Sequence, residues 1–136
     1  MRLLIATHGT MAAGLKSALS IIVGNVDKID TITAYVEDVD LKKELDTYFE
    51  AHKDEEIVVC TDLFGGSVNQ TIIQRLKERT FDLITGTNLA VLLELAIAIN
   101  SDTCSKDTIK NAVNTAREQV MYVNDALASA SDDDFD

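Results

Sequence analysis

The chain has 136 residues, a length that suits one domain with a sizeable core. Hydrophobic residues make up 46% of it and charged residues 26%, which excludes a largely disordered protein. The 12 basic and 23 acidic residues give a net charge of −11, which disfavours nucleic acid and anionic membranes as main partners. Two cysteines are too few for a disulfide framework or a tetrahedral thiolate metal site.

The apolar stretches are too short to cross a membrane or to form a signal peptide. The longest, residues 89–99, is interrupted by Glu94. The N-terminal apolar run ends at His8, before it reaches the length of a signal-peptide core. We therefore expect a cytoplasmic protein whose first apolar run is a buried strand.

Short apolar runs alternate along the chain with segments of helical spacing. Continuous apolar runs such as 3–6 and 57–60 are typical of central parallel strands that are buried on both faces. Asp40 and Ser105 are placed to cap the helices that follow them. In chain order, the pattern predicts a strand at 3–6, a helix at 11–23, a strand at 32–36, a helix at 41–49, a strand at 57–60, a helix around 72–76, a strand at 81–85, a helix at 89–99 and a last helix from Ser105 to Val120.

This βαβα rhythm predicts an α/β fold, a three-layer αβα sandwich on a mostly parallel sheet. Residues 1–128 are expected to form the domain, and the acidic tail 129–136 is expected to be disordered. The helix at 89–99 is apolar nearly all round. Either a second subunit covers it, or the last helix of its own chain does.

Several common site motifs are absent from the sequence. There is no G-x-G-x-x-G, no G-x-S-x-G and no H-E-x-x-H. Residues 9–17 come close to a P-loop, but Leu15 displaces Lys16 by one helical residue, about 100° around the axis. Lys16 would then miss a phosphate held by the loop, so we assign no P-loop.

Two polar segments follow predicted strands at the edge where α/β folds bind ligands. Residues 7–9 (THG) follow the first strand, and residues 61–67 (TDLFGGS) follow the third. His8 is either reactive or a structural histidine bound to a loop carbonyl. Asp62 either faces a ligand or caps a tight turn. His52 lies in a charged run at a helix end, which favours a solvated surface position.

The glycines of the second segment predict an anion site. Gly65 and Gly66 allow backbone N–H groups to turn toward a ligand, and Ser67 or Asn69 is placed to cap the next helix. A helix N-terminus with free N–H groups binds anions, phosphate above all.

The two segments together indicate a definite chemistry. If the first and third strands are neighbours, His8 and Asp62 face one crevice. A carboxylate that accepts a hydrogen bond from one ring nitrogen leaves the other nitrogen as a nucleophile. With a phosphate cradle beside it, such a pair makes a phosphohistidine site that needs no metal and no cofactor.

These residues resemble the IIA domains of the mannose/fructose/sorbose family of the bacterial sugar phosphotransferase system. The resemblance covers the chain up to the acidic tail. Many members have proline after the serine, where this chain has Val68; proline there only presets φ, so valine can take the position. The matching residues are Thr7-His8-Gly9 with Ala12 and Gly14, Thr61 to Ser67, Gly86-Thr87-Asn88-Leu89 and Arg117-Glu118.

The resemblance implies a sheet order of 2-1-3-4 in a homodimer. It also implies an antiparallel strand near the C-terminus, exchanged between subunits, which we place at Met121 to Asn124. It makes His8 the residue that the phosphocarrier HPr phosphorylates on Nε2, with Asp62 hydrogen-bonded to Nδ1. The phosphoryl group then passes to a IIB subunit and on to a sugar taken up through the membrane subunits IIC and IID.

The surroundings of His8 divide into two expected groups. Phosphoryl binding is assigned to Thr7, Gly9, Gly65, Gly66 and Ser67. A mainly apolar partner surface is assigned to Met11, Leu63 and Phe64, although Phe64 has packing under the loop as its alternative.

Two other functions stay open from the sequence. One is the related phosphotransfer subunit of dihydroxyacetone kinase, although residues 65–67 resemble the sugar-transport family more closely. The other is a regulatory module in which phosphorylation of His8 only switches partner binding.

Overall fold

A parallel sheet forms the centre of the fold in a computed structural model, which describes the backbone of residues 1–34 and 40–134 and side chains through residue 129. The strand order, β2-β1-β3-β4, confirms the order implied by the resemblance. Its strands are β1 (Arg2–His8), β2 (Ile29–Ala34), β3 (Ile57–Thr61) and β4 (Asp82–Ile84).

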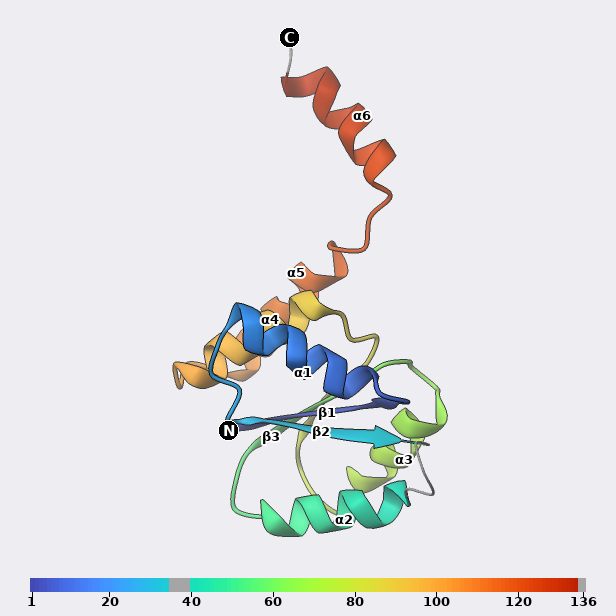
Figure 1. The fold of residues 1–136 in the computed structure, drawn as a ribbon, viewed down its shortest axis with the longest axis vertical. Helices are drawn as coiled ribbons and strands as arrows, with labels where there is room; N and C mark the ends of the chain where they lie inside the picture. Colours follow the sequence, from blue (N-terminus) through green and yellow to red (C-terminus); the bar gives the residue numbers. More distant parts are fainter. Residues whose placement is uncertain (35–39, 135–136) are drawn as a thin grey trace.

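Helices cover both faces of this sheet, which confirms the three-layer sandwich (Figure 1). One face carries α1 (Met11–Ile22), α4 (Leu89–Asn100) and α5 (Lys106–Arg117). The other carries α2 (Leu41–Ala51) and α3 (Ser67–Arg75). The last helix, α6 (Val123–Asp134), leads away from the sandwich (Figure 1).

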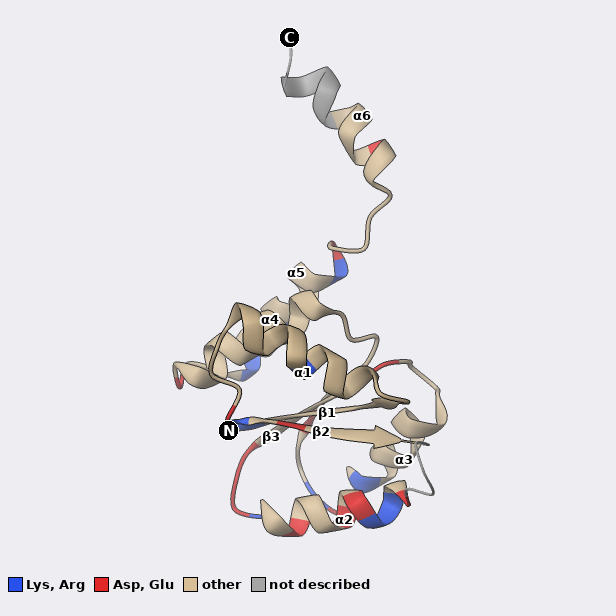
Figure 2. Ribbon diagram, viewed as in Figure 1, with Lys and Arg blue, Asp and Glu red and all other residues tan. Residues whose placement is uncertain are grey.

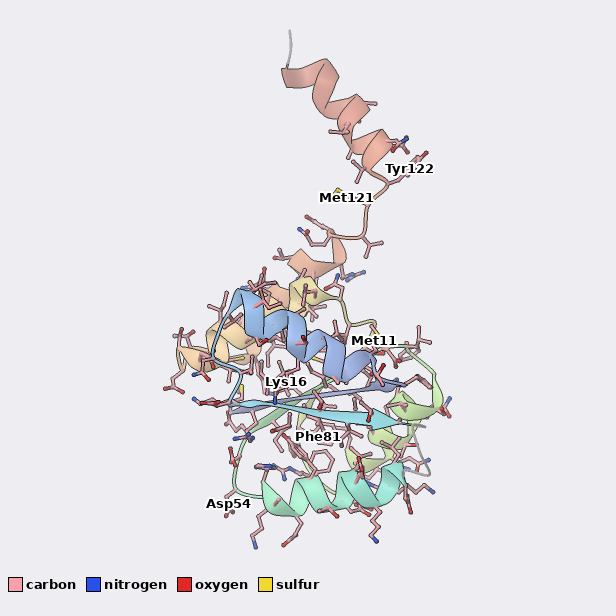
Figure 3. All side chains as sticks on the ribbon, viewed as in Figure 1. Met11, Lys16, Asp54, Phe81, Met121 and Tyr122 are labelled. Atoms are coloured by element: carbon pink, nitrogen blue, oxygen red, sulfur yellow. The ribbon has the colours of Figure 1, made fainter. Side chains whose placement is uncertain are left out.

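The central strands contribute to two separate cores because their side chains alternate between the faces of the sheet. Leu3 and Ile5 of β1 pack toward α1, α4 and α5, whereas Leu4 and Ala6 pack toward α2 and α3. On the second face Phe81 lies between the sheet and α2 (Figure 3), with its ring centroid 5.0 Å from that of Phe49. Continuous apolar runs were the right signal for these doubly buried strands.

Three helices are capped at their N-termini by a side-chain hydrogen bond. Asp40 accepts from the backbone N–H of Lys43, and Ser105 accepts from that of Thr108, so both predicted caps are confirmed. Asn88 caps α4 in the same way. Helix α5 ends at Arg117, before the predicted end at Val120.

Strand β2 begins three residues before the predicted start at Ile32. The early part of the strand was not predicted because Asp30, a charged residue, interrupts the apolar pattern that indicates a strand. Its carboxylate accepts from the Arg2 guanidinium at 2.8 and 3.0 Å and from the Tyr48 hydroxyl at 2.8 Å. Residues 35–36 of the predicted strand lie outside the described residues.

Helix α4 is covered by its own chain. Its buried side chains pack in the core formed with the sheet, α1 and α5, and Ile97 is exposed. Of the two explanations for this apolar helix, burial under the C-terminal helix of the same chain is therefore the one that the structure supports. The expectation that a second subunit is needed to cover the helix is wrong.

The C-terminal segment differs from the expected strand at Met121 to Asn124. Met121 and Tyr122 connect α5 to α6, and the next residues begin the helix (Figure 3). The segment leads away from the sheet, so its backbone bonds locally instead: the N–H groups of Asp125 and Ala126 both donate to the carbonyl of Tyr122. The exchange of a strand between subunits stays a prediction.

Helix α6 extends to Asp134, into the tail 129–136. The expectation that this tail is disordered stays a prediction. None of the helices described is long and apolar enough to cross a membrane.

Candidate active site

The site is built on the parallel pairing of β1 with β3. In this pairing Ala6 lies opposite Thr61, so the residues that follow both strands emerge at the same edge of the sheet. His8 ends β1 and Asp62 comes directly after β3. The condition on which the predicted crevice depended, that the first and third strands are neighbours, is confirmed.

Asp62 and His8 are joined by two hydrogen bonds. The Asp62 Oδ2 atom accepts from the backbone N–H of His8 at 3.0 Å and lies 2.9 Å from its ring Nδ1. The other oxygen, Oδ1, accepts from the backbone N–H of Leu63 at 3.0 Å. The Asp62 side chain is 10% exposed and that of His8 is 39% exposed. The carboxylate is thus held inside, while the imidazole is open to a partner.

Two opposing effects act on the pKa of the Asp62 carboxyl. Burial raises this pKa, but the hydrogen bonds from His8 and Leu63 together outweigh burial and hold it below its ordinary value. Asp62 is therefore ionised at neutral pH and acts as an acceptor. The proton of a neutral His8 ring then belongs on Nδ1, which leaves the lone pair on Nε2.

The loop after β3 closes around the Nε2 side of the ring. The Ser67 hydroxyl oxygen lies 3.4 Å from Nε2. A Cβ at Gly66 would touch the neighbouring ring carbon Cε1 at 3.5 Å, so glycine keeps the space beside the ring open. Gly65 has a φ of +76°, a conformation that favours glycine.

Helix α3 starts at this loop without a side-chain cap. Gly66 is its N-cap residue, Ser67 is its first helical residue, and no described side chain accepts a cap hydrogen bond there. The expectation that Ser67 or Asn69 caps the helix is therefore wrong. The first-turn N–H groups, beside His8, are the kind of donors that bind phosphate.

Thr7 and Gly9 flank His8 in the sequence, and both are hydrogen-bonded to backbone groups of neighbouring segments. The Thr7 side chain is fully buried, and its hydroxyl accepts from the Ala12 N–H at 2.8 Å, which ties the start of α1 to β1. Gly9 has a φ of +57° and donates its N–H to the Ala34 carbonyl at 2.9 Å. These contacts shape the turn after His8. A role of both residues in phosphoryl binding stays a prediction.

Two polar residues of α3 support the loop, and neither role was predicted. The Gln70 side-chain amide donates to the Gly65 carbonyl at 2.9 Å. The Asn69 side-chain oxygen accepts from the Thr61 hydroxyl at 2.8 Å. The signal for both was present as two adjacent amides in the first turn after a glycine loop.

An apolar rim surrounds this edge, and we define it as Met11, Leu63 and Phe64. Their exposures are 43%, 62% and 81%. The alternative in which Phe64 packs under the loop as core is wrong. A partner-binding role for the rim stays a prediction.

The second histidine, His52, lies away from this site. His52 follows α2 and pairs with Glu55, its Nδ1 atom lying 2.8 Å from Oε1. Within the described residues, no group of three or more His, Cys, Asp or Glu side chains is placed to hold a metal ion.

Comparison with known proteins places this fold and site among the components of the bacterial sugar phosphotransferase system. The sequence profile of the EIIA-man family, described as the PTS system fructose IIA component, matches residues 2–122. The chain therefore belongs to this family of phosphotransferase-system IIA components, as the sequence resemblance indicated.

Individual relatives agree with this assignment. The sorbose-specific EIIA component of Lacticaseibacillus casei is 27% identical, over 99% of this chain and all of that protein. A protein from Klebsiella pneumoniae, assigned as a phosphoenolpyruvate-dependent sugar phosphotransferase-system permease, has a crystal structure with a TM-score of 0.84 over 93% of both chains and is 31% identical. An EIIA component from Streptococcus agalactiae, 23% identical, shares the fold with a TM-score of 0.76 over 90% of this chain and 97% of its own.

Replacing Asp62 by asparagine tests the tautomer assignment. In the wild type we expect neutral His8 to carry its proton on Nδ1; in Asp62→Asn the amide can instead donate to Nδ1 and favour the proton on Nε2. The ¹⁵N shifts of the His8 ring report the two forms. His52 serves as the internal control and should not change. An unaltered His8 spectrum would show that Asp62 does not set the tautomer.

Proposed function

We propose that the protein accepts a phosphoryl group from phosphorylated HPr on Nε2 of His8 and passes it to a IIB subunit of a sugar uptake system. The observation that carries the proposal is the pairing of Asp62 with Nδ1, which leaves Nε2 facing Ser67 and the uncapped start of α3. Membership of the IIA family supports the sugar-transport role over a dihydroxyacetone kinase subunit.

The transfer follows from the protonation state of the ring. The Nε2 lone pair attacks the phosphorus of the donor phosphohistidine, a new P–N bond forms, and the P–N bond to the donor breaks with its electron pair returning to the donor nitrogen. The Nδ1 proton stays hydrogen-bonded to Asp62, whose charge stabilises the ring as it becomes positive. Asp62→Asn should therefore slow transfer by at least about a hundredfold while the fold is retained.

The remaining members of the site bind the transferred group. The Ser67 hydroxyl and the first-turn N–H groups of α3 donate to the phosphoryl oxygens, together with the backbone of Gly65 and Gly66. The IIB subunit then takes the group onward, in the cytoplasm, to the sugar that enters through IIC and IID. No cofactor takes part in this chemistry.

Phosphorylation of His8 is the central expected outcome. With enzyme I, HPr and phosphoenolpyruvate, the wild type should acquire an acid-labile phosphate. His8→Gln should abolish labelling, because glutamine has no nucleophilic ring nitrogen. His52→Gln is the matched control and should label fully, since His52 has neither the loop nor the buried carboxylate beside it.

Two outcomes would redirect this assignment. Labelling that survives in His8→Gln would remove His8 as the acceptor. Labelling of His8 without onward transfer to any IIB subunit would favour the regulatory module, in which phosphorylation switches partner binding only.

The apolar rim is the proposed contact surface for HPr and IIB. Its members are exposed around a histidine in a protein whose net charge is −11, and none of them is charged. Salt screens long-range attraction over about 8 Å at physiological ionic strength, so close contact depends on such apolar groups. Helix α1, which begins at the rim residue Met11, has Lys16 as its one charged residue. Its ribbon is accordingly almost entirely tan in Figure 2.

Phe64→Ala should separate recognition from stability. We expect transfer from phosphorylated HPr to slow about tenfold, as for loss of an interface aromatic. The free energy of unfolding should change by less than about 0.5 kcal/mol, because the ring is mostly exposed. The control is Ile21→Ala, which changes an exposed apolar residue on α1. It should alter neither the transfer rate nor the free energy of unfolding. Unchanged transfer, or a collapse of the fold in Phe64→Ala, would contradict the rim proposal.

A homodimer is proposed on the C-terminal arm, which we define as residues 118–134. The large apolar side chains that the structure describes in it, up to residue 129, are exposed, a state that indicates a missing partner. The arm leaves the sandwich beside an open groove lined by Val91, Val113 and Val120. We propose that a second copy covers the arm. The exposed apolar residues are Val120, Met121, Tyr122, Val123 and Leu127.

Sedimentation at micromolar concentration should therefore give about twice the chain mass of 14.9 kDa. Adding charge in the arm, with Val120→Asp and Tyr122→Asp together, should give the monomer mass because charges cannot be buried unpaired. The control Ile21→Asp adds charge to an exposed isoleucine on α1 and should leave the dimer intact. A monomeric wild type would refute the dimer.

A further inference from the structure

A buried threonine stands directly before each of the paired residues of the site. Thr7 precedes His8 and Thr61 precedes Asp62, and both threonine side chains are fully buried. Each hydroxyl bonds to the first turn of the helix that follows its strand. Thr7 bonds to the backbone of α1, whereas Thr61 bonds to a side chain of α3, that of Asn69.

The backbone carbonyl of Thr61 is held by Thr87. Its carbonyl accepts from both the backbone N–H of Thr87 at 3.1 Å and the Thr87 hydroxyl at 2.7 Å. Thr61 also belongs to the β1–β3 pairing, opposite Ala6. The bond from Thr61 to Asn69 therefore ties the first turn of α3 to the end of β3, which is itself held by its pairing with β1 and by Thr87.

The stability of the fold does not explain why position 69 carries an amide side chain. The Asn69 side chain is 1% exposed, and its Nδ2 atom has no hydrogen-bond partner among the described residues. Leaving a buried amide group unpaired costs free energy, and an apolar side chain of equal size avoids that cost. The Thr61 hydroxyl also has a second acceptor, the carbonyl of Ile84 at 3.5 Å, so it does not depend on Asn69.

The bond does fix a position that the site uses. Asn69 lies two residues after Ser67, in the same helical turn, and α3 has no side-chain cap to set its first turn. Movement of this turn would change the 3.4 Å separation between the Ser67 hydroxyl and His8 Nε2. Displacements of this kind change transfer rates strongly even when no reacting group is lost.

We propose that Asn69, through its hydrogen bond with the Thr61 hydroxyl, is a positioning residue that sets Ser67 against His8 Nε2. Asn69 touches neither the ring nor the phosphoryl group and acts through the placement of the helix start. This inference rests on the proposed phosphoryl transfer to His8.

The test uses single-turnover transfer from phosphorylated HPr to the full chain, with KM for HPr measured alongside. Thr61→Val removes the hydroxyl at constant shape and should lower the maximal rate about ten- to a hundredfold with KM unchanged. Thr61→Ser keeps the hydroxyl and should restore most of the rate. Thr85→Val is the matched control, because that buried hydroxyl has no hydrogen-bond partner among the described residues.

A double-mutant cycle separates positioning from general damage to the fold. If Thr61 and Asn69 act through Ser67, Thr61→Val should have less than about a twofold effect on the rate in a Ser67→Ala background. Its effect on the unfolding midpoint should be the same in both backgrounds. A full additional loss of rate in Ser67→Ala would overturn the proposal.

A second variant keeps the test decisive if Thr61→Val folds poorly. Asn69→Leu removes the amide and fills the same space, so it should preserve or raise the unfolding midpoint while lowering the rate. An unchanged rate in folded Asn69→Leu would overturn the inference. Failure of wild-type His8 to accept phosphate would instead overturn the proposed function, which distinguishes the two.

Discussion

The hydrogen bonds between Asp62 and His8 connect the ends of two neighbouring parallel strands, and the arrangement of the site depends on them. They bring together residues 54 positions apart in the sequence. The same carboxylate fixes the backbone of His8, the ring of His8 and the start of the following loop. Because three donors converge on one buried side chain, the ring orientation and the loop position are set together.

The helix start after this loop complements the pair. A cap residue at Gly66 or Ser67 would make α3 more stable and would also occupy the donors that face the ring. The chain leaves the helix without such a side chain and holds it from behind instead, through Gln70 on the loop and Asn69 on the sheet. The position of the helix end is thus set by side chains that lie at a distance from the donors.

The sequence predicted most of this arrangement because its strongest signals are local. Apolar runs identified β1 and β3, and chemistry-bearing residues directly after them identified His8 and Asp62. The structure brings these two together as expected. The start of strand β2 was misplaced because Asp30 is a charged residue whose partners are distant along the chain: Arg2 forms an ion pair with it and Tyr48 donates a hydrogen bond to it.

Other features depended on contacts that a linear pattern does not carry. The coverage of α4 by α5 of the same chain requires the packing of two helices. The hydrogen bonds of Thr7 with Ala12 and of Gly9 with Ala34 likewise appear only once the chain is folded. The sequence shows an amide at Asn69 after a glycine loop, but its role depends on Thr61, a partner across the turn that the linear pattern does not reveal.

The buried charge of Asp62 has a consequence for the energy stored in the proposed phosphorylated state. The carboxylate, ionised because its hydrogen bonds lower its pKa, lies on one side of a small ring, and the phosphoryl dianion lies on the other. Like charges at this separation repel, and low solvent access strengthens the repulsion. In the proposed phosphorylated state this repulsion would raise the transfer potential of the phosphoryl group, whereas the attraction between Asp62 and the positive ring and the dipole of α3 would oppose that rise. In the proposed carrier, the balance of these opposing electrostatic effects sets how readily the phosphoryl group is released to the next protein.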